Sequence, residues 1–101
     1  MATIQVSENA ENGVVTISIR DRFDFSTHKE FRASYKDRSS ASCYVINMKD
    51  VNYIDSSALG MMLLLREHAG AKHGKVVIAN CTPEIKKILA IANFDRLFEI
   101  Q

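Results

Sequence analysis

Asp55, Ser56 and Ser57 are the residues whose types and spacing are best suited to chemistry in this chain. They precede an apolar stretch that begins Ala58-Leu59, so we expect the carboxylate and both hydroxyls to lie at the start of a helix. The first four backbone N–H groups of a helix have no partner within it and would stabilise a phosphate added there. A simpler interpretation fits the same residues: Asp55 or Ser56 only caps the helix, and Ser57 is a first-turn residue.

A catalytic serine would need a neighbouring base, and the histidines of the chain are His28, His68 and His73. Their spacing places none of them beside Ser56, and the Gly-x-Ser-x-Gly motif of many hydrolases is absent. His28 falls early in an amphipathic segment and the other two near a polar helix end, where we expect solvated side chains. A serine hydrolase is therefore only the remote alternative.

Strand patterns on both sides of this stretch predict a sheet. Residues 14–20 are β-branched and alternate with polar ones, and Asn12-Gly13 is a turn signal that joins them to an earlier strand at 3–7 as a hairpin. Further strands are predicted at 43–48, 75–79 and 96–100, with a connector over 49–54. The nearly continuous apolar run at 43–48 is typical of a sheet that is covered on both faces.

Helices are predicted between the later strands, so these strands should be parallel. The first helix is predicted from Ser26 or Thr27 to about Arg38, with Thr27 and Glu30 spaced as in a capping box. The second helix runs from Asp55-Ser56 to about residue 68, with Met61 and Met62 expected in the core. The third begins at Thr82-Pro83-Glu84, and its apolar face is formed by Ile85, Ile88, Leu89 and Ala92. The expected fold is α/β, a mixed β-sheet with an N-terminal hairpin and helices packed against it.

Length and charge limit the function further. A chain of 101 residues should form one domain, over residues 1–101, and its formal net charge of +1 is far from that of a nucleic-acid-binding domain. The longest apolar-rich run, 58–65, is well short of the roughly 20 residues that span a bilayer. Cys43 and Cys81 lie in apolar runs, and the N-terminus lacks a signal-peptide pattern, so we expect reduced core cysteines in a cytoplasmic protein. No metal site or cofactor is expected.

Residues 55–60, Asp-Ser-Ser-Ala-Leu-Gly, resemble the Asp-Ser-Ser/Thr-Gly-Leu-Gly signature of STAS domains, specifically the free-standing bacterial anti-sigma-factor antagonists. Residues 22–26, Arg-Phe-Asp-Phe-Ser, resemble a second marker of that family, a Gly-x-Leu-Asp segment that leads into the first helix. The resemblance extends over nearly the whole chain in length and element order. Two positions depart from it: Asp21 replaces the usual upstream glycine, which suggests a turn without a required positive φ, and Ala58 replaces the glycine of the signature, which a helix tolerates.

The resemblance implies a phosphorylation-switched binding module. It assigns phosphorylation to Ser56 and partner binding to Asp24, Phe25, Ser26, Asp55, Ser57, Leu59 and Gly60. The unphosphorylated form would bind an anti-sigma factor that is also a serine kinase of the histidine-kinase-like ATPase type, and so free a sigma factor. A serine phosphatase would reverse the modification.

Relatives with this fold also serve as subunits of lipid-transport complexes and of stress-signalling assemblies, which is the alternative function. The resemblance further implies a monomer when unbound, and it leaves open whether Ser57 is modified too.

Overall fold

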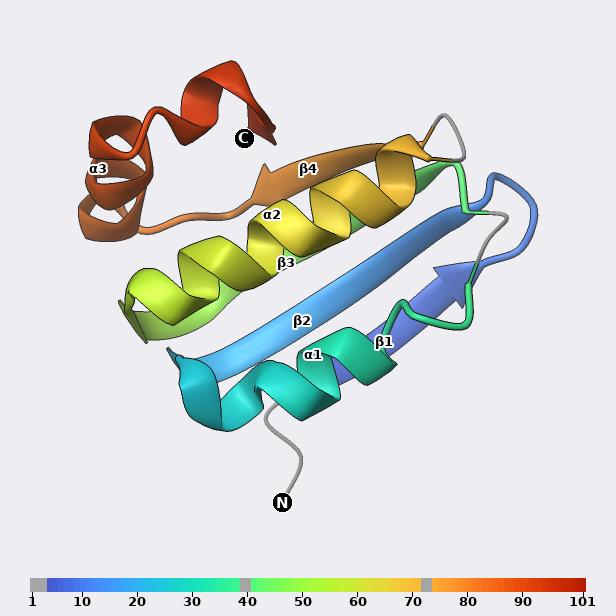
Figure 1. Ribbon diagram of the computed structural model, residues 1–101, viewed down its shortest axis with the longest axis horizontal. Helices are drawn as coiled ribbons and strands as arrows, with labels where there is room; N and C mark the ends of the chain where they lie inside the picture. The colour runs from blue at the N-terminus through green and yellow to red at the C-terminus, as the bar shows by residue number, and fades with distance from the viewer. Residues whose placement is uncertain (1–3, 39–40, 72–73) are drawn as a thin grey trace.

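The computed structural model describes residues 4–38, 41–71 and 74–101, and their strands lie side by side behind the helices (Figure 1). The strands are β1 Ile4–Asn9, β2 Val14–Phe23, β3 Cys43–Ile54, β4 Lys75–Ala79 and β5 Glu99–Ile100. The helices are α1 His28–Ala33, α2 Ser56–Gly70 and α3 Pro83–Ile91, with single 3-10 turns at η1 Phe25–Thr27 and η2 Phe94–Arg96.

The described strands form one five-stranded sheet in the order β1-β2-β3-β4-β5. Strand β1 is antiparallel to β2, and the pairs β2–β3, β3–β4 and β4–β5 are parallel. With this order each strand lies next to the one that follows it in sequence: a tight turn joins β1 to β2, and the later connections contain helices. The predicted mixed α/β fold with an N-terminal hairpin is confirmed.

The sheet is covered mainly on one face. In β2, Val15, Ile17 and Ile19 are fully buried, whereas the residues between them are only half-buried. In β3, Ile46 is fully buried beside the half-buried Val45, so the prediction of a sheet covered on both faces is wrong.

The segment predicted as a connector at 49–54 is instead the second half of β3. It pairs with an equally unpredicted extension of β2, as far as Phe23 opposite Ile54. The register shifts between Ser18 and Arg20 and again between Asp21 and Arg22, so the polar residues here do not follow a regular two-residue alternation. Because the alternation of apolar and polar residues is interrupted, the sequence pattern did not predict that β2 and β3 extend this far.

Asp21 lies at the second of these shifts with a φ of 64°, in the left-handed region. The expectation that this position needs no positive φ is therefore wrong. The backbone keeps the conformation that suits glycine although the residue is an aspartate, one of the few other types that tolerate it.

The first helix is shorter than predicted. Residues 25–27 form a 3-10 turn, regular α-helix covers 28–33, and turns continue to residue 37. Thr27 makes no side-chain cap to the helix, so the predicted capping box with Glu30 is absent; the Thr27 hydroxyl donates to the Asp24 carbonyl at 2.8 Å instead.

The ends of α3 and of the chain also differ in part from the prediction. Ile85 and Leu89 are buried as expected, but Ile88 is 40% exposed. Residues 94–96 form the turn η2, so the final strand is only Glu99–Ile100 rather than 96–100. Met61 and Met62 are both buried, which confirms that they belong to the core.

We predict that Asp21→Gly stabilises the protein by about 0.5–1 kcal/mol, because glycine removes the left-handed strain of an L side chain at this φ. Asp50→Gly is the matched control: Asp50 is an exposed strand residue without a positive φ, and the same change should destabilise it by about 0.5–1 kcal/mol. Urea unfolding of both variants measures these effects. Equal destabilisation by the two changes would contradict the assignment of strain to Asp21.

Candidate functional site

The candidate site lies where β2 and β3 end. Phe23 and Ile54 are paired in the parallel register, so the residues that follow them, Asp24 and Asp55, leave the sheet side by side. Each aspartate has an extended backbone and caps the turn or helix that begins next. The starts of η1 and α2 therefore come together at one end of the strands, on the left in Figure 1. This is the carboxyl end of the parallel strands, where α/β proteins commonly bind their ligands.

Asp55 organises the first turn of α2. Its Oδ1 accepts a hydrogen bond from the Ala58 N–H at 3.0 Å and another from the Ser57 hydroxyl at 2.7 Å. Ser56 is exposed, and among the described residues no hydrogen bond engages its hydroxyl. One of the two adjacent serines is thus held by the cap, and the other is presented to solvent.

Asp24 repeats this arrangement at the end of β2. Its Oδ1 accepts from the Ser26 N–H at 3.0 Å and from the Ser26 hydroxyl, and its Oδ2 lies 3.1 Å from the Arg22 Nε. These hydrogen bonds, that of the Ser26 hydroxyl first and that of Arg22 second, hold the pKa of Asp24 below its usual value. The carboxylate is therefore ionised throughout the physiological range, and its cap is lost only as the pH falls through that lowered pKa.

Phe25 is the apolar feature of this edge, with 65% of its surface exposed. Its ring stacks on His28, with the ring centroids 4.4 Å apart. Leu59 is partly buried against the core, whereas Gly60 is exposed on α2 and a side chain there would meet no atom within 4 Å. The predicted partner-binding residues thus provide exposed apolar surface next to polar caps.

The histidines do not form a catalytic pair with Ser56. His68 lies 12 residues further along α2, about 18 Å away at 1.5 Å per residue. The expectation that His68 is solvated is wrong. Its ring packs against Tyr35 and Tyr44, and its Nε2 lies 2.6 Å from the Arg38 carbonyl oxygen. The His28 ring stacks on Phe25, and no hydrogen bond among the described residues joins His28 to Ser56. His73 lies outside the described residues.

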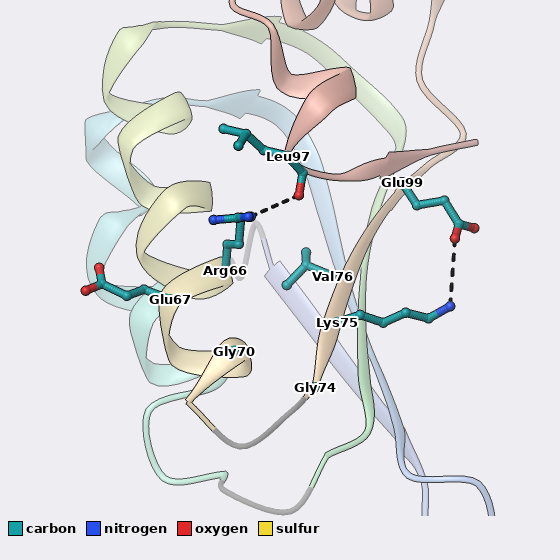
Figure 2. A pocket seen from close by; sticks show the side chains of 8 residues that line it. All are labelled: Arg66, Glu67, Gly70, Gly74, Lys75, Val76, Leu97 and Glu99. Carbon is teal, nitrogen blue, oxygen red and sulfur yellow. Dashed lines mark hydrogen bonds and ion pairs between the residues drawn. The ribbon is translucent and has the colours of Figure 1, made fainter.

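A cavity of about 490 Å³ lies at the opposite end of α2, beside β4 and β5 (Figure 2). Its charged groups are already used: the Arg66 Nε donates to the Leu97 carbonyl at 2.9 Å, and the Lys75 ammonium lies 3.7 Å from Glu99. Glu67 points away from the centre of the cavity (Figure 2). The cavity brings no nucleophile and base together, and we assign it no function.

The part of the chain that is described was also compared with the requirements of metal binding, membrane crossing and thiol chemistry. Residues 4–38, 41–71 and 74–101 contain no group of three or more potential metal-ligating side chains, and none of their helices is both long and apolar enough to cross a membrane. Cys43 is buried, Cys81 is half-buried, and both are free thiols. Burial raises the pKa of each thiol, so neither is activated as a nucleophile.

Comparison with known proteins gives the family. The STAS domain model matches residues 4–101. A STAS-domain-containing protein of Pseudomonas aeruginosa is 47% identical over 93 residues, which cover 91% of this chain and 92% of that protein. The chain belongs to the STAS domain family.

Solved structures of anti-sigma factor antagonists share the fold at low sequence identity. The Bacillus anti-sigma factor antagonist SpoIIAA in its unphosphorylated form has a TM-score of 0.75 and 17% identity, covering 97% of this chain and 86% of that one. Its phosphorylated form has the same TM-score, 18% identity, and covers 97% and 90%. An anti-sigma factor antagonist from Mycobacterium paratuberculosis has a TM-score of 0.80 and 20% identity, covering 97% and 83%.

Arg22 and Tyr53 are residues of this STAS domain whose part in the site was not evident from sequence. They are partners in the β2–β3 register, and the Arg22 guanidinium lies 4.1 Å from the centre of the Tyr53 ring. The same guanidinium reaches Asp24, so the exposed Tyr53 ring and the Asp24 cap are held by one side chain. In the sequence, the spacing Arg22-x-Asp24 hints at this ion pair. The hint is useful only when β2 and β3 are known to extend to these residues.

We predict that Ser26→Ala raises the pKa of Asp24, because the Ser26 hydroxyl contributes most to its depression. Arg22→Ala should raise the same pKa as well, because it removes both a hydrogen bond and a positive charge. A carbon-detected NMR titration of the Asp24 carboxyl group measures both shifts, and Ser57→Ala, which removes the hydroxyl bound to Asp55, should leave Asp24 unchanged. An Asp24 pKa that is insensitive to Ser26→Ala would refute this cap.

Proposed function

We propose that this STAS domain protein is an anti-sigma-factor antagonist that binds its partner only while Ser56 is unphosphorylated. The observation that carries the proposal is the contrast at the start of α2: the Ser57 hydroxyl is held by Asp55, while that of Ser56 is exposed and has no hydrogen-bond partner among the described residues. A kinase needs a hydroxyl that can enter its active site. Of the two adjacent serines, Ser56 meets that need without breaking the cap of the helix.

The surroundings of Ser56 explain why a phosphate would change binding and leave the fold intact. The modification adds about −1.5 to −2 charges beside the Asp55 carboxylate, so an acidic or apolar partner group seated there would be repelled. The free N–H groups of the first turn of α2 can donate hydrogen bonds to the phosphate, and they lie at the positive end of the helix dipole. The Ala58 N–H already donates to Asp55, so the phosphate would use other N–H groups of the first turn. The hydrogen bond between Ala58 and Asp55 would therefore persist with and without the phosphate.

The surface that would be switched extends from α2 to the neighbouring turn. Asp24, Phe25 and Ser26 lie beside Asp55 because their strands are paired up to that point. Phe25 supplies the exposed aromatic ring that often anchors a protein interface. A partner that covers Ser56 would thus also contact the Phe25 ring, and Leu59 and Gly60 would lie on the helix side of the same footprint.

Family membership and the fold shared with SpoIIAA support this function. SpoIIAA is named as an anti-sigma factor antagonist, and its structure has been solved in both an unphosphorylated and a phosphorylated form. By extension the partners of this chain are an anti-sigma factor with serine-kinase activity of the histidine-kinase-like ATPase type, and a serine phosphatase. The protein itself is then a cytoplasmic binding module without a cofactor, rather than an enzyme.

We predict that the kinase partner adds one phosphate to this protein, at Ser56. The partner is captured from cells of the source organism on immobilised protein, and the purified complex is incubated with ATP and analysed by intact-protein mass spectrometry. Wild-type protein and Ser57→Ala should gain one phosphate, and Ser56→Ala none. Phosphate on Ser56→Ala at the wild-type level would overturn the assignment.

Capture itself tests the switch. Ser56→Ala should retain the ATPase partner, and Ser56→Asp should lose it, because the added carboxylate imitates part of the phosphate charge. Capture of a transporter subunit in place of an ATPase, with no dependence on residue 56, would favour the lipid-transport alternative and contradict the proposal.

A further inference from the structure

A strongly basic face lies on α1 and the turn that follows it. A cavity of about 340 Å³ there is lined by His28, Lys29, Arg32, Ala33 and Lys36. We call the side chains of Lys29, Arg32 and Lys36 the α1 basic face. They are spaced at three and four residues, and the Lys36 N–H donates to the Arg32 carbonyl at 2.9 Å, so the helical spiral continues to Lys36. At 100° per residue, these three side chains occupy about 60° of the helix circumference.

The three cations carry no ionic partner in the part of the chain that is described. Arg22 pairs with Asp24, Arg38 with Glu8 and Lys75 with Glu99, and none of these ion pairs involves the α1 basic face. Like charges three and four residues apart repel each other on a helix. An anionic partner would relieve that repulsion, so the free protein is electrostatically prepared for one.

The shape of this face limits what that partner can be. Ala33 contributes only a methyl group, which leaves the space between the cations open. Lys29 and Lys36 are seven residues apart, about 10 Å along the axis. An extended chain covers that span with about three residues at 3.4 Å each. Because side chains alternate along an extended chain, every second residue of a short acidic run would place a carboxylate toward the α1 basic face.

Nucleic acid is a poorer match. Duplex binding commonly uses about 6–10 phosphate contacts, whereas this face offers three cations on a protein with a formal net charge of +1. We propose that the α1 basic face docks an acidic segment of a partner protein.

The α1 basic face also continues into the edge that carries the proposed switch. His28 lines the same cavity and stacks on Phe25, one of the expected partner-binding residues. A single partner can therefore cover Phe25 and place an acidic segment along α1. Assigning the acidic segment to the partner that reads Ser56 rests on the proposed function, whereas the docking of an acidic segment on α1 does not.

The test uses a fluorescently labelled peptide of alternating Asp and Glu residues, with an Asn/Gln peptide of the same length as control, and the full chain. Fluorescence anisotropy should show binding of the acidic peptide that weakens with salt, and no binding of the Asn/Gln peptide. The charge-reversed variant Lys29→Glu/Arg32→Glu/Lys36→Glu should bind at least about tenfold more weakly. Lys29→Gln/Arg32→Gln/Lys36→Gln, which removes the charges without adding carboxylates, should also weaken binding.

The matched control is Lys49→Glu/Lys86→Glu/Lys87→Glu, which makes the same change of formal net charge at exposed lysines of β3 and α3. At physiological salt, where screening acts beyond about 8 Å, it should change the affinity less than about threefold. Equal losses in the two charge-reversed variants, or no binding by the wild type, would overturn the proposal. Tighter binding of anionic lipid vesicles or of a DNA oligonucleotide than of the acidic peptide, lost in the α1 variant, would overturn it too.

These measurements use neither a kinase nor an anti-sigma factor, and they are repeated with Ser56→Ala. Peptide binding that is retained in Ser56→Ala supports docking on α1 independently of the switch. Failure of phosphorylation at Ser56 would refute the proposed function alone, and failure of the peptide to bind would refute the docking surface alone.

Discussion

The parallel pairing of β2 with β3, carried as far as Phe23 opposite Ile54, is the constraint on which the rest of the site depends. Because the two strands end level with each other, the residues that follow them start their turns side by side. The buried faces of the same strands hold the helices in place, and Phe23 packs its ring on Phe31 of α1 at a centroid distance of 5.1 Å. A slip of the register would separate the two caps and turn buried side chains outward. The core and the site are therefore specified by one interaction.

The two aspartate caps show how a small domain can present one reactive group without loosening its framework. Asp24 holds the Ser26 hydroxyl, and Asp55 holds the Ser57 hydroxyl, so both turns are closed by their own side chains. In the part of the chain that the structure describes, the Ser56 hydroxyl makes no such hydrogen bond. A charge added to a group that holds nothing together changes the surface that a partner meets, and it leaves the hydrogen bonds beneath in place. A phosphorylation switch requires this separation between groups that hold the fold and a group that can be modified. Because the formal net charge is only +1, one phosphate would also change its sign.

Sequence alone was sufficient for the parts of this structure that follow regular periodicity. The hairpin, the parallel order of the later strands, and the start of α2 at Ser56 all agree with prediction. The misses fall where tertiary pairing overrides local pattern. Residues 49–54 look like a connector because their polar side chains face solvent, yet β2 recruits them into β3. The positive φ of Asp21 occurs at a shift of strand register, whereas the aspartate at this position suggests from sequence that no positive φ is needed. His68 was expected in solvent because its helix end is polar, and Tyr35 and Tyr44 enclose it from other elements.

In the function we propose, a phosphate on Ser56 alters the surface at the carboxyl ends of the parallel strands and leaves α2 folded. Hydrogen–deuterium exchange tests it most directly, by comparing unmodified protein with protein that carries phosphoserine at position 56 by synthesis. The account predicts unchanged protection of the buried part of α2, around Met62 and Leu65, with differences confined to residues 24–27 and 54–60. Loss of protection throughout α2 would contradict it, because the phosphate would then act by unfolding the helix rather than by changing its surface.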